Sequence, residues 1–277
     1  MNTINSLSSL QGSPSSNGRT WQSFSLLFLC FFAFYILLFT CTYSHATDVS
    51  GVISTSTTWT LANSTYIVTG NVLVDQGVTL TIDPGVTVKF TTGTYLRIDG
   101  ALKAEGTAVN HIIFTSKQLI PAAGDWQYIK FTDTSDDANC KISCCEIKYA
   151  TSGIYCDNAS PAINYSTFTY HSNTGIYCYG SGTNPSINNS FISNNNNGIY
   201  CDSYATSHID YNSICNNSNY GIYYVNTSPT NDLLLKINNN IISYNNGIGI
   251  YCSAGSYVIA NNKIFNNTAG IKLGRTL

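Results

Sequence analysis

Residues 187–202 read INNSFISNNNNGIYCD, and variants of this stretch occur six times between residues 142 and 273. In each copy an apolar residue stands five positions after an opening Ile, and a Gly-Ile pair begins 11 or 12 positions after that Ile. Successive copies start 21 to 28 residues apart. The opening residues are Ile142, Ile163, Ile187, Ile209, Ile237 and Ile259. A fixed internal period of this length is typical of a repeat protein.

The composition of each copy indicates what the repeated unit is. Its apolar runs are very short and turn residues separate them, so no copy has room for a helix long enough to pack. One coil of a parallel β-solenoid, with two or three short strands, fits this pattern. The sequence therefore predicts an all-β solenoid in which each copy makes one circuit.

The N-terminal half continues the same pattern. Leu80-Thr81-Ile82 and Val86-Thr87-Val88-Lys89-Phe90 alternate apolar and polar residues, and Asp83-Pro84-Gly85 marks a turn between them. No linker composition interrupts the chain. We predict one domain over residues 47–277, with N-terminal coils over 47–141, the repeats over 142–277, and about nine or ten coils in all.

The first residues have the composition of an export signal. Residues 24–39 are apolar apart from Ser25 and carry no charge, and Ser44-His45-Ala46 offers small residues at the positions of a cleavage site. We predict a signal peptide over residues 1–46 and a secreted or cell-surface protein. An uncleaved signal anchor is the alternative, and only in that case would the protein be held at a membrane.

The overall charge excludes one class of partner. Only 9% of the 277 residues are charged, the net charge is −2, and the 12 Lys and Arg residues are scattered along the chain. A nucleic-acid-binding protein needs clustered basic residues to neutralise phosphates. We therefore expect no nucleic-acid partner.

Alternation within Gly153-Ile154-Tyr155-Cys156 places the Ile and the Cys on one face of a strand and the Tyr on the other. The last copy has Lys272 in the Tyr position, which indicates that this column faces solvent. The interior column contains Cys156, Cys178, Cys201, Tyr224 and Cys252. Free buried thiols are one interpretation. Disulfides between neighbouring coils, or with Cys140, Cys144 or Cys145, are the other. No His stands at ligand spacing, so neither a metal nor another cofactor is predicted.

Two polar columns support the same coil. Asn tolerates the left-handed backbone conformation and bonds neighbouring backbone, so it suits tight bends, and stacked amides can form a ladder. The first column holds Ser166, Ser190, Asn212, Asn240 and Asn262, and the second holds His171, Asn195, Asn217, Asn245 and Asn267. We assign both columns a structural role.

Two segments resemble the right-handed parallel β-helix superfamily that includes pectate lyases, and more narrowly its cell-surface and periplasmic repeat proteins. One runs from VTLTIDPGVTV at residues 78–88 to GALKAEGT at residues 100–107, and the other is the repeat over 142–271. The resemblance implies a single-stranded right-handed parallel β-helix. It specifies activity poorly, because this fold hosts many unrelated sites.

The outward aromatic column is the candidate ligand-binding site. It holds Tyr155, Tyr177, Tyr200, Tyr223 and Tyr251. Aromatic faces stack on sugar rings, so a flat row would suit a polysaccharide chain, and we expect a structural or adhesive surface module with possible polysaccharide binding. The alternative is that the rings only stabilise neighbouring strands.

An enzyme is the second class of function that the resemblance raises, namely a polysaccharide lyase or glycoside hydrolase acting on a polyuronate-like glycan. The weak catalytic candidates are Asp157, Asp202, His208 and Asp210. No Lys or Arg stands between Lys148 and Lys236, so these acids are expected to lack a basic partner. We therefore favour a non-catalytic role.

Two further features concern partners and modification. The sequence shows no polar cap after the sixth Gly-Ile pair, which predicts either a longer parent protein or self-association through the C-terminal coil. Seven Asn-x-Ser/Thr sequons make glycosylation possible. They begin at Asn63, Asn158, Asn164, Asn188, Asn216, Asn226 and Asn266.

Overall fold

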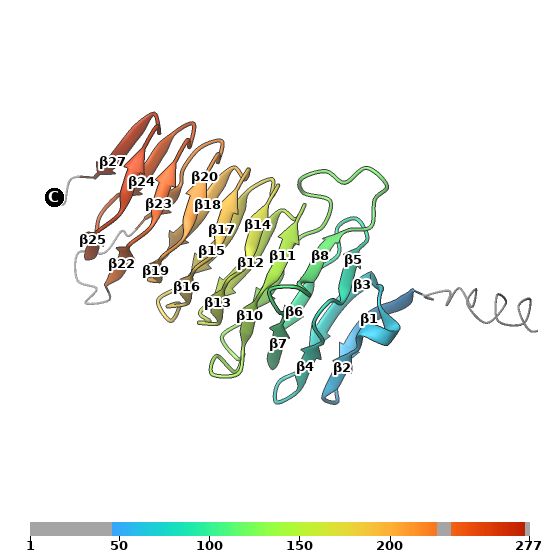
Figure 1. The fold of residues 1–277 in the computed structure, drawn as a ribbon. Helices are drawn as coiled ribbons and strands as arrows, with labels where there is room; N and C mark the ends of the chain where they lie inside the picture. Colours follow the sequence, from blue (N-terminus) through green and yellow to red (C-terminus); the bar gives the residue numbers. More distant parts are fainter. Residues whose placement is uncertain (1–45, 226–233, 275–277) are drawn as a thin grey trace, which may run out of the picture. The chain divides into compact units, whose positions relative to one another are not determined.

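The computed structural model describes residues 46–225 and 234–274, so residues 1–45 of the predicted signal peptide lie outside the described part. The described residues form 27 β-strands and one 3-10 helix, η1 (Leu61–Asn63). The strands pair in parallel and wind into a right-handed solenoid of about ten turns (Figure 1). The predicted parallel β-helix is confirmed. None of the described residues belongs to a helix that is long and apolar enough to cross a bilayer.

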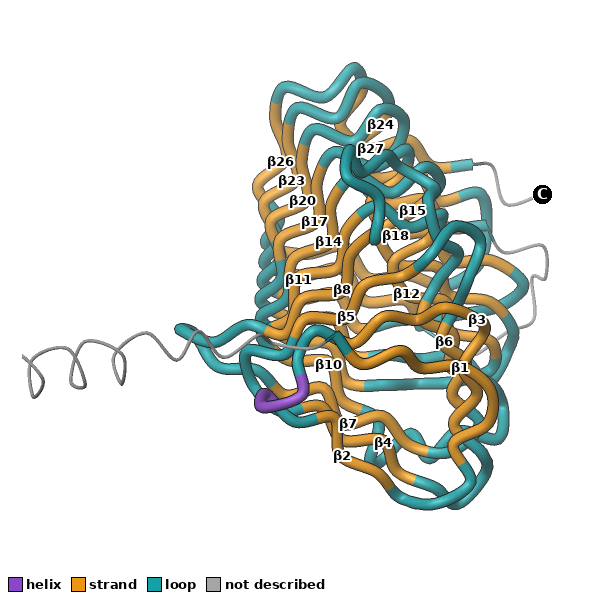
Figure 2. The backbone as a smooth tube through the Cα atoms, turned by 90° about the vertical axis from the view of Figure 1, so that its right-hand side faces the viewer, coloured by secondary structure: helices purple, strands orange, loops and turns teal. Residues whose placement is uncertain are grey.

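Each turn contributes to three faces, and the strands of successive turns lie over one another on each face (Figure 2). Face 1 holds β2 (Thr57–Trp59), β4 (Thr79–Ile82), β7 (Ala101–Glu105), β10 (Lys141–Ser143), β13 (Ala162–Asn164), β16 (Ser186–Asn188), β19 (His208–Asp210), β22 (Leu235–Asn238) and β25 (Tyr257–Ala260). Face 2 holds β5 (Thr87–Phe90), β8 (Ile112–Ser116), β11 (Cys145–Lys148), β14 (Thr167–Thr169), β17 (Phe191–Ser193), β20 (Ser213–Cys215), β23 (Ile241–Ser243) and β26 (Lys263–Phe265). Face 3 holds β6 (Leu96–Ile98), β9 (Ile129–Phe131), β12 (Ser152–Asp157), β15 (Thr174–Tyr179), β18 (Asn197–Asp202), β21 (Ile222–Tyr224), β24 (Ile248–Cys252) and β27 (Ala269–Leu273). The long strands β1 (Thr47–Ile53) and β3 (Tyr66–Val74) run along faces 2 and 3.

The interior consists of in-register columns of apolar side chains. On face 3, Ile154, Ile176, Ile199, Ile222 and Ile250 pair in succession and are fully buried. The predicted thiol column lies beside them, with Tyr224 between the last two cysteines. All eight cysteines of the described residues are free thiols in the structure. Stacking identical residues every turn fills the core without a helix.

Left-handed residues close the two corners that flank face 2, but they are not the ones expected. The residue types predict this conformation for the members of the two polar columns. In the structure the residue before each column member has the positive φ, as at Tyr211 (φ 58°) before Asn212 and Asn216 (φ 56°) before Asn217. The column side chain therefore turns inward, and the residue before it, Asn or Tyr in most turns, sits outside.

The polar columns form the predicted ladders inside these corners. The Asn217 amide Nδ2 donates to Asn245 Oδ1 (2.9 Å), and Asn245 Nδ2 donates to Asn267 Oδ1 (2.8 Å). The backbone N–H of Asn195 also donates to Asn217 Oδ1 (3.1 Å). These bonds satisfy polar groups that water cannot reach, as buried groups require. His171 starts the second ladder, and its Nδ1 accepts the N–H of Ala150 (3.1 Å).

The Gly of each Gly-Ile pair is explained by close approach between turns. A Cβ at Gly221 would lie 2.6 Å from the carbonyl oxygen of Gly249 and 2.9 Å from Asn245 Nδ2. The ladder and the glycine column are thus one packing unit. In the last described turn, by contrast, Ile271 and Leu273 are 46% and 51% exposed.

Candidate functional site

The five tyrosines of the outward column lie on face 3, one in each of five consecutive turns. Tyr155 pairs with Tyr177, Tyr177 with Tyr200, Tyr200 with Tyr223, and Tyr223 with Tyr251. Each follows a buried Ile, so the alternation of the strand turns it outward. The predicted column is therefore present on the outside of the solenoid, and its rings are half-buried. We call these five residues the tyrosine stripe.

The rings of the stripe pack mainly against one another. Successive ring centroids are 4.9 to 5.1 Å apart, with interplanar angles from 13° to 73°. Much of each ring face is covered by the neighbouring ring at these distances, so a ligand would meet ring edges and hydroxyl groups more than open faces. The ring centroid of Tyr128 lies 5.7 Å from that of Tyr155, and the ring centroid of Tyr220 lies 4.4 Å from that of Tyr223. These two rings could not be found from the repeat, because they stand outside the Gly-Ile-Tyr motif.

The phenol hydroxyls of Tyr155, Tyr177, Tyr200 and Tyr223 remain protonated donors near neutral pH. Partial burial raises the pKa of Tyr177 and raises that of Tyr200 to about 12, and the Asp202 carboxylate adds to both shifts. The pKa values of Tyr155 and Tyr223 are raised for the same first cause. No hydrogen bond joins any of the five hydroxyls to another residue of the described ranges. They are available to a ligand.

A second outward column lies beside the stripe and carries two of the predicted acids. Asp157 pairs with Tyr179 and Tyr179 with Asp202, so the two aspartates are two turns apart. At the usual strand spacing their backbones are about 9–10 Å apart. Tyr179 is 38% exposed between them, and its ring centroid is 6.2 Å from that of Tyr177.

Asp157 has a basic partner, which corrects the expectation from the sequence. Lys130 Nζ lies 2.8 Å from Asp157 Oδ2 and 4.5 Å from the centroid of the Tyr155 ring. Lys130 belongs to β9, the preceding turn on face 3, and pairs with Tyr155. Lys130 precedes the interval between Lys148 and Lys236 that lacks basic residues. Only the pairing of β9 with β12 in the structure shows that its side chain reaches Asp157.

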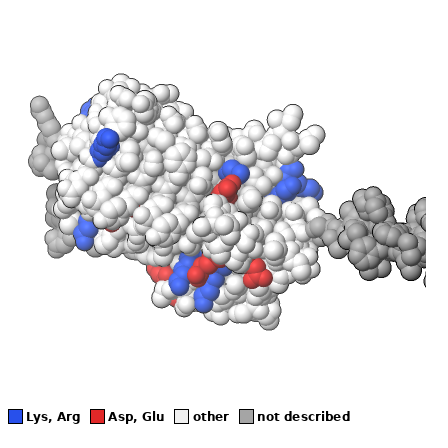
Figure 3. Space-filling model, viewed as in Figure 1, with Lys and Arg blue, Asp and Glu red and all other residues white. Residues whose placement is uncertain are grey.

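Other charges lie at the two ends of the stripe. Arg97 precedes Lys130 in the same outward column and pairs with Asp99 (Nε to Oδ1, 2.8 Å). Lys272 follows Tyr251, with Nζ 6.0 Å from its ring centroid. Charged side chains are few and scattered over the view in Figure 3, with broad uncharged surface between them.

The remaining catalytic candidates lie elsewhere. His208 and Asp210 are on β19 of face 1, where they pair with residues of β16 and β22. Asp157 and Asp202 are on face 3. The four candidates are therefore not brought together into one acid–base site. No group of three or more His, Cys, Asp or Glu side chains within residues 46–225 and 234–274 could hold a metal ion.

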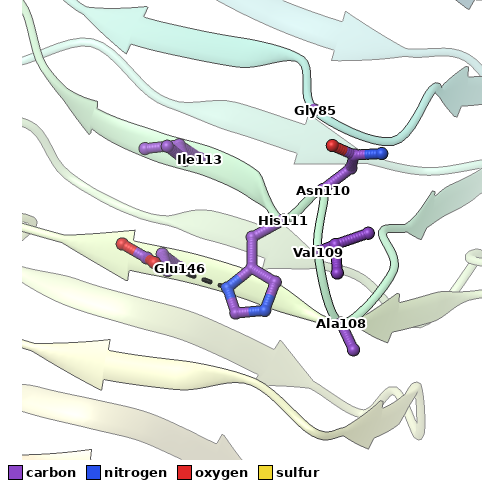
Figure 4. Close-up of a pocket in the computed structure, with 7 residues that line it drawn as sticks. All are labelled: Gly85, Ala108, Val109, Asn110, His111, Ile113 and Glu146. Carbon is purple, nitrogen blue, oxygen red and sulfur yellow. Dashed lines mark hydrogen bonds and ion pairs between the residues drawn. The ribbon is translucent and has the colours of Figure 1, made fainter.

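Face 2 carries a separate hollow that no sequence motif indicates. It has a volume of about 340 Å³, and Gly85, Asn110, His111 and Glu146 are among the residues that line it (Figure 4). His111 Nδ1 lies 3.4 Å from Glu146 Oε1, and Lys148 Nζ lies 2.8 Å from Glu146 Oε2. The pKa of Glu146 is lowered, chiefly by the hydrogen bond from Lys148 and to a smaller extent by His111. His111 and Glu146 are 35 residues apart in sequence, so no local motif joins them.

Comparisons with known proteins agree with this architecture. A family described as the right-handed beta helix region matches residues 129–276, and a pectate-lyase-like beta helix domain matches residues 51–171. No curated protein sequence matches the chain. Among solved structures, a mutant of the periplasmic alginate epimerase AlgG is similar, with a TM-score of 0.50 and 13% sequence identity. The match covers 79% of this chain and 66% of the epimerase chain, just under two thirds, and at this identity it supports the fold alone.

Proposed function

Because the chain belongs to the right-handed beta helix family, we propose that it is a secreted or cell-surface β-helix module that binds a polysaccharide along the tyrosine stripe. The observation that carries this proposal is the row of five tyrosine hydroxyls, one per turn, which are joined to no other described residue by a hydrogen bond. The rigid ladder of turns fixes their spacing before any ligand arrives. A preorganised surface loses little conformational entropy on binding.

The chemistry of the stripe suits a sugar chain. A polysaccharide presents hydroxyl groups at regular intervals, and phenol groups can both donate and accept hydrogen bonds. The half-buried rings add apolar area beside these polar tips. A chain that lies across the turns would meet one tyrosine after another along the axis of the solenoid.

Removing single hydroxyls separates binding from stability. Tyr200→Phe keeps the ring stack, whereas Tyr200→Ala removes it. Stacked neighbours contribute roughly 0.2–1 kcal/mol per pair, so only the Ala variant is expected to unfold at lower denaturant concentration. The Phe variant is expected to lose glycan retention at unchanged stability.

The measurement is a glycan array, followed by affinity electrophoresis in the best-retained glycans. Chitin and cellulose oligomers, xylan, polygalacturonate and alginate should be included. Tyr211→Phe, on an exposed corner residue away from the stripe, is the matched control. Retention by no glycan, or equal retention by wild type and Tyr200→Phe, would refute the proposal. Release of cleavage products from the uronate polymers would favour the enzymatic alternative instead.

A further inference from the structure

The protein itself holds an ammonium group on the stripe. Lys130 Nζ sits 4.5 Å from the Tyr155 ring centroid and 2.8 Å from the Asp157 carboxylate. Both partners come from β12, where Asp157 stands two residues after Tyr155 on the same outward side. A ring combined with a carboxylate is a known arrangement for holding a cation.

The same pair occurs again two turns later. In β18, Asp202 stands two residues after Tyr200. Pairing through β15 aligns Tyr200 with Tyr155 and Asp202 with Asp157. The position that Lys130 occupies for the first pair is taken by Tyr177 for the second. The Tyr200–Asp202 pair therefore has the ring and the carboxylate, and a tyrosine where the first pair has its lysine.

Among residues 46–225 and 234–274, no basic side chain lies within ion-pair distance of Asp202. The sequence has no Lys or Arg from residue 149 to residue 235, which includes the segment outside the described ranges. The one hydrogen bond seen at the Asp202 carboxylate within the described residues comes from the Ser203 N–H (2.6 Å). Burial is the largest cause of the raised pKa of Tyr177 and of Tyr200, and the negative charge of Asp202 is the second. The Asp202 charge is therefore felt by the stripe.

The cations at the N-terminal end of the stripe are already paired. Lys130 is bound to Asp157 and Arg97 to Asp99. The centre of the stripe therefore carries a negative charge without a positive one beside it. A polyuronate lying across this surface would bring like charges together, which costs binding energy.

We propose that the stripe binds a glycan that carries free amino groups, with one ammonium group paired with the Asp202 carboxylate and donating to a phenol oxygen of the stripe. Tyr177 fills the place at Tyr200 that Lys130 takes at Tyr155, so this ammonium group is held by the carboxylate and hydroxyl groups and not over a ring face. This inference rests on the proposed polysaccharide binding and names the class of sugar. A charge-assisted hydrogen bond within a partly exposed ion pair is expected to favour an amino sugar over its N-acetylated form about tenfold.

Three oligomers of equal length test the inference by titration calorimetry. They are the glucosamine, N-acetylglucosamine and galacturonate oligomers, compared in low salt at about pH 5.5, where amino groups are protonated and carboxylates are ionised. We expect the glucosamine oligomer to bind most tightly and the galacturonate oligomer least. The preference for the amino form should shrink as salt is added.

Asp202→Asn is the decisive variant, because its amide oxygen can still accept the Ser203 N–H. It is expected to lose the tenfold preference and to keep its affinity for the N-acetylated oligomer. Asp210→Asn removes a carboxylate from face 1 and is the matched control, which should leave all three affinities unchanged. Far-ultraviolet circular dichroism checks that both variants are folded.

The outcomes separate the inference from the proposed function. Equal binding of the amino and N-acetylated oligomers by wild type would overturn the inference and leave the proposed function standing. A preference that survives in Asp202→Asn would overturn the assignment of the site. Tightest binding of the galacturonate oligomer would overturn the inference as well. Binding of no glycan, here and on the array, would overturn both.

Discussion

Acid should destabilise the solenoid through one buried histidine. His171 stands at the start of the second polar ladder, is 2% exposed, and accepts the Ala150 N–H at Nδ1. Desolvation by burial lowers its pKa from 6.5 to about 3. The folded protein therefore keeps this imidazole neutral, whereas the unfolded chain binds a proton below about pH 6.5.

The direction and size of the effect follow from this difference. The unfolded state binds more protons between these two pKa values, so stability falls as the pH falls from about 6.5 towards 3. Each pH unit in this range costs about 1.4 kcal/mol. At pH 4.5 the loss attributable to His171 is about 2.7 kcal/mol, a substantial fraction of the 5–15 kcal/mol typical of a folded domain.

His171→Asn tests this reasoning, because Asn occupies the same position in the next four turns. Urea unfolding followed by circular dichroism should show that wild type loses about 2.7 kcal/mol more than this variant between pH 7.5 and pH 4.5. His208→Asn, on the outer side of β19, should retain the wild-type pH dependence. An equal loss in wild type and His171→Asn would refute the assignment.

Two other predictions concern the packing between turns. Gly221→Ala places a Cβ 2.6 Å from the Gly249 carbonyl oxygen, so it should lower the free energy of unfolding in urea by about 1–3 kcal/mol. Gly270→Ala is the control and should change this free energy little, because the nearest atom to its Cβ is Ile264 Cγ2 at 3.7 Å. Equal losses in the two variants would contradict the close approach. Iodoacetamide on the native protein, followed by mass spectrometry, should label Cys144 first, because the other described thiols are buried and burial raises the pKa of Cys252 to about 12. Thiols that remain unlabelled after unfolding without reductant would instead indicate disulfides.

The winding of the chain could be predicted from the sequence because packing and register repeat together. Each buried Ile, Cys and ladder Asn must meet its equivalent one turn away, and this requirement appears in the sequence as a period. The corners were assigned less well. A left-handed backbone is accepted by Asn189 and also by Tyr165 and Tyr211, so residue type alone did not identify the position that adopts it.

The outward face was predictable only in part, for a physical reason. Solvent-exposed positions need not repeat, and so their neighbours cannot be found from a period. The Tyr column was visible because it happens to repeat, whereas the contact of Lys130 with Asp157 depends on how β9 stacks on β12 after a connection of 20 residues. The hollow at His111 and Glu146 arises in the same way from the stacking of β11 on β8.

Function in such a solenoid therefore depends on the places where neighbouring turns differ. A column of identical residues stabilises every turn alike, but it gives a ligand no reason to choose one position along the axis. On face 3 the tyrosines make the surface uniform over five turns, and Asp157, Tyr179 and Asp202 make three of those turns unequal. Lys130 neutralises the first of these acids and leaves the second without a basic neighbour on its strand or the strand before it. The position and charge of a bound sugar should accordingly be set at Asp202, while the length of chain that binds should depend on how many tyrosines it crosses.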